Sequence, residues 1–390
     1  MQAVKKIKES DLPVWFYGID ATMNRDSQHN VVLTDAYAGV SYGGLNLFAG
    51  KKAEFFGLAD TLLTAGPNVY SRNAPTIPKI AISTNGFIEL NDLFAVNAYF
   101  AHGWMGDENF VKNAFLHQKF LYLRYGESNP RKGINIYAGI HHLAIWGGTN
   151  RVNGEHYPSG LDDFWRVISG KAGDAGAAGI DRQNALGDHR GSIDYALLLK
   201  GRQRDWHVYA GTLFEDGSGI KLFKWYDYFA GVSMINKGVN GVLKRVNFEV
   251  FNTMNHGNNP WEPDNYFNNY EYQSGWTYNG FGIGHPFIRF ITGKNYQYTA
   301  QNRVRAVNAS ALLHFSRLAN PYLRMAYSEN YGYVNEPLSD NNQIKIFSFD
   351  ITNTSFLYDG WSLTQELCFD TGKNVNGVIG GSVTVTKTVF

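Results

Sequence analysis

Apolar and polar residues alternate along much of the chain, in segments of about 10 to 15 residues. Residues 204–216 show the pattern: Trp206, Val208, Ala210, Thr212 and Phe214 fall on one side, and His207, Tyr209, Gly211 and Glu215 on the other. An aromatic ring stands at each end of the apolar side, and charged residues lie just beyond both ends. A period of two residues predicts a β-strand, because successive side chains of a strand point to opposite faces.

Gly/Asn/Asp turns separate these segments, and helical periodicity is nearly absent. We therefore expect an all-β fold in one domain spanning residues 1–390. The expected strands are 12–22, 31–42, 44–57, 78–90, 93–105, 115–127, 134–148, 191–202, 204–216, 220–236, 242–255, 303–317, 320–331, 342–356, 358–371 and 376–390.

The lengths of these strands and of the links between them indicate whether the apolar side faces lipid or a protein core. Strands of soluble proteins usually have only about 5–6 residues. The predicted links fall into a short class, such as 42–44 and 201–205, and a long class, such as 149–190 and 256–302. Short turns at one end and long loops at the other are typical of outer-membrane barrels. The pattern predicts a transmembrane antiparallel β-barrel of about 16–18 strands, with lipid on the apolar side and long extracellular loops partly plugging the mouth.

The composition of the chain excludes several classes of binding partner and cofactor. The formal net charge is +1 and only 18% of residues are charged, so we expect no nucleic-acid partner. Cys368 is the only cysteine, which excludes an intrachain disulfide and a thiolate metal cluster. No cofactor and no metal are expected. The first residues, MQAVKKIKESDLP, lack the apolar core of a signal peptide.

Several stretches in the same order resemble one known family. They are AGKKAEFFG (49–57), SRNAPTIPKI (71–80), AYFAHGWMGDENFVKNAFLHQKFLYLRYG (98–126), GIHHLAIWGG (139–148), EDGSG (215–219) and DNYFNNYEYQSGWTYNGFGIGHPF (264–287). Together they resemble Wzi-type capsule assembly proteins, and in particular the Bacteroidetes branch of that family. The resemblance runs from about residue 12 to the end of the chain.

The resemblance implies a non-catalytic protein in the outer membrane of a Gram-negative bacterium. It would bind capsular or other surface polysaccharide and organise it at the cell surface, and we expect a monomer. The family's signal peptide and periplasmic helical segment have no counterpart here, which predicts that the numbered chain starts inside the full-length protein. Three alternatives remain: a porin or carbohydrate channel, an outer-membrane hydrolase and a soluble β-rich lectin.

Sugar binding needs aromatic faces for stacking and planar polar groups for paired hydroxyls. The long loops are rich in both, and loops present such groups outward. The candidate glycan-binding residues are Trp146, Asn150, Arg151, Trp165, Asn184, His189, Arg190, Asp264, Asn265, Asn268, Tyr270 and Trp276. Residue by residue, the plainer interpretation is that they pack the loops against one another.

Three further features give specific expectations. Residues 159–170 resemble a short helix capped by Ser159 with Asp162 returning, which is either a lid over the pore or a loop stiffener. At His141 and His142 the apolar positions change phase, which predicts a β-bulge. These two side chains point opposite ways and so do not predict a metal site. In the lumen, Arg245, Glu249 and Glu366 are expected to pair across the barrel.

Overall fold

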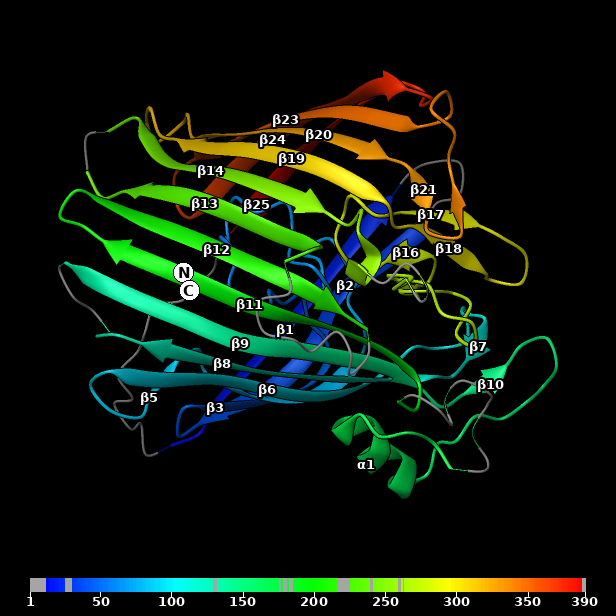
Figure 1. Ribbon diagram of the computed structural model, residues 1–390. Coiled ribbons are helices and arrows are strands. Elements are labelled where there is room, and N and C mark those ends of the chain that lie inside the picture. The colour runs from blue at the N-terminus through cyan, green and yellow to red at the C-terminus, as the bar shows by residue number, and fades with distance from the viewer. Residues whose placement is uncertain are drawn as a thin grey trace.

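The computed structural model describes residues 12–24, 30–128, 132–174, 177, 181, 185–215, 225–238, 241–258, 261 and 263–387. One antiparallel sheet dominates it and curls into a barrel (Figure 1). Its strands are β1 (Val14–Asn24), β2 (Asn30–Tyr42), β3 (Leu45–Lys51), β4 (Lys79–Thr84), β5 (Ile88–Glu89), β6 (Phe94–Trp104), β8 (Phe115–Tyr125), β9 (Gly133–Trp146), β11 (Asp188–Lys200), β12 (Arg204–Phe214), β13 (Tyr228–Asn236), β14 (Leu243–Asn252), β19 (Val304–Leu313), β20 (Pro321–Asn330), β23 (Ile344–Phe356), β24 (Trp361–Lys373) and β25 (Val378–Lys387).

Shorter elements lie in the links between these strands. They are β7 (Val111–Lys112), β10 (Thr149–Asn150), β15 (Thr277–Tyr278), β16 (Phe281–Gly282), β17 (Arg289–Thr292), β18 (Tyr298–Gln301), β21 (Gly332–Tyr333), β22 (Glu336–Pro337), the helix α1 (Leu161–Ser169) and a 3-10 turn (His256–Asn258). Among the described residues, no helix is long and apolar enough to span a bilayer.

Each long strand pairs with its neighbour in the sequence, as a hairpin barrel requires. Strands β4 and β5 both pair with β6, so they form one strand that residues 85–87 interrupt. The pattern therefore predicted the long strands correctly, apart from their ends and this interruption. Links such as 43–44 and 201–203 are short, whereas 52–78, 147–187 and 253–303 are long. In outer-membrane barrels the long loops face the cell exterior.

The wall is apolar outside and polar inside, the reverse of a soluble fold. On β14, Val246 and Phe248 are exposed, whereas Arg245, Asn247 and Glu249 are buried in the lumen. On β12, Trp206 and Val208 are likewise exposed. The Tyr209 hydroxyl donates to Glu249 at 2.6 Å inside the barrel. The outer face therefore suits lipid, which offers no hydrogen-bond partner to polar groups.

The extracellular end of β12 departs from this prediction. Phe214 lies on the apolar side of the pattern but is buried. Its ring covers Gly191 of β11, where a Cβ atom would stand 1.9 Å from the ring, and stacks 6.3 Å from the ring of His142 on β9. A glycine is needed at position 191 because the Phe214 ring occupies that space.

The bulge predicted at His141 and His142 is wrong. Strand β9 keeps an unbroken register with both neighbours, β8 and β11. His141 contacts Gln118 at 3.0 Å in the lumen, and His142 contacts His189 at 2.8 Å on the outer wall. The apparent change of phase arises because both faces of this end of β9 are covered, so every side chain from His141 to Trp146 is buried.

Helix α1 exists, but the predicted cap at Ser159 is wrong, and of the two interpretations of this helix the structure does not support the lid. Gly160 is the N-cap, and its N–H donates to the Asp163 carboxylate at 2.9 Å. The start is one residue later than expected. Phe164 and Val167 of the helix pack with Ala144 and Trp146 of β9. The helix lies outside the wall, beside the extracellular ends of β8 and β9 (Figure 1). It does not cross the pore.

The predicted charge pairing in the lumen is also wrong. Arg245 pairs with Asp60, at 2.7 Å, and Asp60 belongs to residues 52–78, which we call the plug segment. Glu249 accepts hydrogen bonds from the Ala65 N–H at 2.7 Å and from Asn308 at 2.8 Å. Glu366 instead accepts a bond from Ser382 at 2.9 Å on the neighbouring strand. The lumen charges hold a loop inside the barrel.

The Asp60–Arg245 pair should be the main electrostatic anchor of the plug segment. Burial raises the pKa of Asp60, but the Arg245 guanidinium and the Leu62 and Leu63 N–H groups outweigh this and lower it. Asp60→Ala leaves a buried guanidinium without its partner and should cost about 3–5 kcal/mol of unfolding free energy. Urea unfolding, followed by heat-modifiable gel mobility, measures the loss.

Two controls accompany this variant. Asp60→Asn with Arg245→Met removes both charges, keeps an oxygen acceptor for the Leu62 and Leu63 N–H groups, and should recover most of the loss. Lys345→Ala breaks an ion pair of similar length, Lys345–Glu329 at 2.8 Å, on the barrel surface and should change little. Equal losses for Asp60→Ala and Lys345→Ala would contradict the anchor.

The filled lumen also predicts poor conductance. Phe56, Val69 and Ile77 of the plug segment belong to the same buried apolar cluster as wall residues such as Tyr99 and Phe251. The purified protein in a planar bilayer should show no stable, long-lived current steps, whereas Asp60→Ala should add brief openings. Large steady steps from the unmodified protein would show that the lumen is open.

Candidate functional site

The extracellular mouth is closed by residues 253–303, which we call the cap segment. Trp276 of this segment is fully buried, and its indole N–H donates to the Val69 carbonyl of the plug segment at 2.7 Å. Two backbone bonds flank this contact: Ser71 N–H to Ile283 O at 2.6 Å and His285 N–H to Asn68 O at 3.0 Å. The plug segment and the cap segment therefore form one packed unit.

The cap segment also binds the remaining long loops. The Phe110 N–H donates to the Ser274 hydroxyl at 2.7 Å. In loop 147–187, the Tyr157 hydroxyl donates to Glu271 at 3.1 Å and the Gly147 carbonyl accepts from the Tyr272 hydroxyl at 3.3 Å. Small strands of these loops gather at this end of the barrel (Figure 1). The result is a cap held by many directional bonds.

Arg190 attaches the cap segment to the barrel wall. Its guanidinium pairs with Asp188 at 2.6 Å and with Glu215, and it donates to the Asn268 carbonyl at 2.7 Å. Glu215 in turn accepts the Phe267 N–H at 2.8 Å. Burial raises the pKa of Glu215 to about 7, although Arg190 opposes the shift. Arg190 is nearly completely buried, and its guanidinium links Asp188 and Glu215 to the Asn268 carbonyl of the cap segment.

The structure distributes the predicted glycan-binding residues among several places. Trp146, Asn150, His189, Arg190 and Trp276 are buried; Arg151, Asp264, Asn265 and Asn268 are half-buried; Trp165 and Tyr270 are exposed; Asn184 lies outside the described residues. Asn150 stabilises a turn by accepting the Val152 N–H at 2.9 Å, and Asn268 donates to Asn265 at 2.9 Å. Glycan contact by this set stays a prediction, and many of its members have bonds within the protein.

Trp146 and His189 lie on the outer wall of the barrel rather than on the cap. Trp146 packs 5.1 Å from Phe115 and 5.9 Å from Phe164, measured between ring centroids. Trp165 projects from α1 on the same side. The structure therefore does not bring the twelve predicted residues together into one site.

An exposed surface on the cap does combine rings, a cation and planar amides. We call it the cap patch: Arg151, Tyr270, Gln273, Tyr296 and Gln297. The Arg151 guanidinium lies 4.3 Å from the centroid of the Tyr296 ring. Ser274 donates to the Tyr296 carbonyl at 2.8 Å, and Gln273 donates to the Tyr270 carbonyl at 3.0 Å. Sequence analysis missed Tyr296 and both glutamines.

Tyr296 occupies an unusual backbone position. It lies at the tip of the β17–β18 hairpin with φ of 61°, after Asn295 with φ of 54°. Two successive positive φ values define the tight hairpin turn in which Asn-Gly is the preferred pair. Here the pair is Asn-Tyr, and a ring replaces the residue that would adopt this conformation without strain. Such strain concentrates at functional sites. In the sequence, this site could be recognised by a tyrosine at a hairpin-turn position where glycine is preferred.

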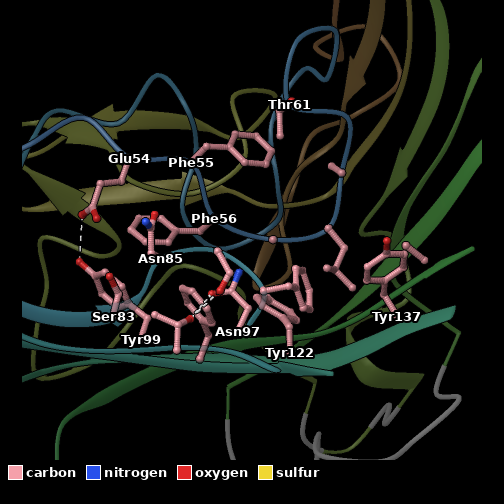
Figure 2. A pocket seen from close by; sticks show the side chains of 18 of the residues that line it. Glu54, Phe55, Phe56, Thr61, Ser83, Asn85, Asn97, Tyr99, Tyr122 and Tyr137 are labelled. Carbon is pink, nitrogen blue, oxygen red and sulfur yellow. Dashed lines mark hydrogen bonds between the residues drawn. The ribbon is translucent and has the colours of Figure 1, made fainter. Parts of the chain in front are cut away.

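A hollow lies inside the barrel, beneath the plug segment. Its volume is about 520 Å³, within the range of small-molecule sites. Asn46 and Ser128 beside the short turns help to line it, so it lies toward the short-turn end. Figure 2 shows aromatic and amide side chains around it, among them Phe55, Asn85 and Tyr137. At its edge Glu54 pairs with Lys79 at 2.7 Å and accepts a bond from Tyr99 at 2.9 Å.

Metal chemistry has no visible centre in the described part of the chain, where no three His, Cys, Asp or Glu side chains form a ligand set. The arrangement is suited to noncovalent binding: stacking on exposed rings, hydrogen bonds from amides, and electrostatic attraction by Arg151.

Comparison with known proteins identifies the family. The model of the capsule assembly protein Wzi family matches residues 8–374. In structure the chain is similar to Wzi of Escherichia coli, an outer-membrane protein involved in group 1 capsule assembly and a carbohydrate-binding β-barrel, with a TM-score of 0.65, 12% identity, and coverage of 97% of this chain and 78% of that chain. OccAB4 of Acinetobacter baumannii aligns with a TM-score of 0.46, 10% identity, and coverage of 97% and 86%.

No curated protein matches the chain by sequence. The family match spans nearly the whole barrel, and the shared fold is that of an outer-membrane β-barrel. The chain therefore belongs to the Wzi family of capsule assembly proteins.

Proposed function

We propose that this protein binds capsular polysaccharide at the cell surface and organises it there, without catalysis, through the cap patch. Membership of the Wzi family supports the biological role. The carbohydrate binding described for Escherichia coli Wzi supports the ligand class. The motifs of residues 98–126 and 139–148 support a Bacteroidetes origin, and the proposal is that the protein acts as a monomer in that outer membrane.

The strained, exposed Tyr296 is the observation that carries the proposal. A ring at this hairpin tip is half-solvated, and the Arg151 guanidinium contacts it from the side of loop 147–187. Sugar rings present C–H surfaces to aromatic faces and paired hydroxyls to planar donors. Arg151 lies beside the Tyr296 ring and already donates to the Asn109 and Asp107 carbonyls. Gln273 and Gln297 also donate within the protein, and a guanidinium or an amide has more than one N–H, so each can add a bond to a sugar hydroxyl. Glycine adopts a positive φ without strain, so it would fit the backbone at position 296 better than tyrosine does. The presence of tyrosine at a strained position indicates that its side chain has a function.

A carbohydrate channel is the second candidate. The hollow of Figure 2 favours it, because rings and amides line a space of small-molecule size. The buried contacts between the plug and cap segments oppose it, because they close the extracellular side of that space. We therefore prefer polysaccharide binding on the outer surface.

Tyr296→Gly separates binding from folding. The variant should unfold no more easily than the parent, and up to about 1 kcal/mol less easily, because glycine adopts positive φ without strain. Binding of purified capsular polysaccharide from the parent strain should weaken about tenfold, which corresponds to about 1.4 kcal/mol. Surface-immobilised protein and soluble polysaccharide provide the measurement.

Tyr358→Ala is the matched control. Tyr358 is also exposed and also has an arginine beside its ring, Arg317 at 4.8 Å, but it lies in the short turn between β23 and β24. It should bind polysaccharide like the parent. If Tyr296→Gly retains full affinity while folding normally, the cap patch is not the binding surface.

A further inference from the structure

Helix α1 covers part of a polar strip on a surface that otherwise faces lipid, and Phe214 and Leu186 contact the rest of it. His102, His117, Lys119, His142 and His189 all lie on the outward face near the extracellular ends of β6, β8, β9 and β11. Lower on the same wall, Leu121, Leu123, Ile134 and Ile136 are exposed. Polar side chains on the lipid face destabilise a barrel, so this strip needs a cover.

Two contacts place the helix over the strip. The Phe164 ring lies 5.7 Å from His102, 6.1 Å from His117 and 5.9 Å from Trp146, measured between ring centroids. The Lys119 ammonium donates to the Ile168 carbonyl in the last turn. A cation at this end also interacts favourably with the helix dipole. The helix is therefore fixed on the wall by its Phe164–Val167 side.

The apolar surface of α1 is wider than the part that the wall covers. With about 3.6 residues per turn, Phe164 and Val167 form one stripe, and Leu161, Trp165 and Ile168 form the stripe beside it. Leu161 is 80% exposed and Trp165 is 63% exposed. Asp162 and Arg166 lie on the opposite side of the helix. One apolar stripe thus contacts protein, and the next is exposed at Leu161 and Trp165 and half-buried at Ile168.

We propose that α1 is an interfacial helix whose Leu161–Trp165 stripe contacts the outer leaflet of the membrane. The stripe continues the exposed apolar wall, where Trp104 and Leu121 lie on the strands beneath the helix. Tryptophan favours the boundary between headgroups and acyl chains, and amphipathic helices lie in that plane. Lipid acyl chains are the occupant that fits, because the same wall already requires them.

A lipid-quenching experiment tests this. Cys368→Ser removes the native thiol, and Trp165→Cys then carries a bimane label in proteoliposomes that contain doxyl-labelled phosphatidylcholine. Leu123→Cys on the bare wall is the lipid-exposed reference, and Tyr270→Cys on the cap is the water-exposed reference. We expect the probe at 165 to be quenched by the doxyl lipid to at least half the extent seen at 123, with the probe at 270 almost unaffected.

The opposite pattern overturns the proposal. Quenching at 165 by aqueous iodide like that at 270, with no quenching by doxyl lipid, would place the stripe in water. Heat-modifiable gel mobility shows which variants are folded, and Leu161→Cys repeats the test one helical turn away if Trp165→Cys fails to fold. The measurement does not involve polysaccharide, so its result is independent of the proposed function.

Discussion

The buried contact between Trp276 and the Val69 carbonyl is the interaction on which the cap depends. Two long loops meet inside a barrel, where their backbone groups lose water and must find partners. Trp276 fills the junction with a large ring and satisfies a carbonyl with its only donor. Around it, backbone bonds from Ser71 and His285 complete the pairing. A loose junction would leave the plug segment without cover and Tyr296 without a rigid support.

Three surfaces follow from this arrangement. The wall is apolar because lipid surrounds it, as the exposed Val246 and Phe248 show. The lumen is polar, and toward its extracellular side it is plugged, because Arg245 and Glu249 bind the plug segment instead of water. The cap is then free to present side chains outward from a fixed backbone. Rigid presentation suits a polysaccharide ligand, because little conformational entropy is lost when the protein binds.

The sequence predicted the wall well and the cap poorly. Alternation is a local signal, and for strands such as β14 it identifies both the strand and the outward face. The bulge predicted at His142 was wrong because both faces of β9 are buried there, so apolar and polar residues do not alternate. Trp276 and Arg190 are residue types that bind sugars, but their burial depends on loops distant in the chain. The position of α1 on the outer wall depends on the contact between the rings of Phe164 and His117. These residues are distant in the sequence, so no local pattern predicts the contact. Tyr296 could have been found from its turn, because Asn-Tyr replaces the usual Asn-Gly.

The most direct test of the central claim is the distribution of capsular polysaccharide in a deletion strain. Polymer retained on cells and polymer released into the medium are measured in the parent, the deletion strain and the complemented strain. A protein that holds polysaccharide through its cap predicts an unchanged total, with polymer shifted from the cells to the medium and restored by complementation. An unchanged distribution, together with reduced uptake of a small solute, would contradict the claim and favour a channel.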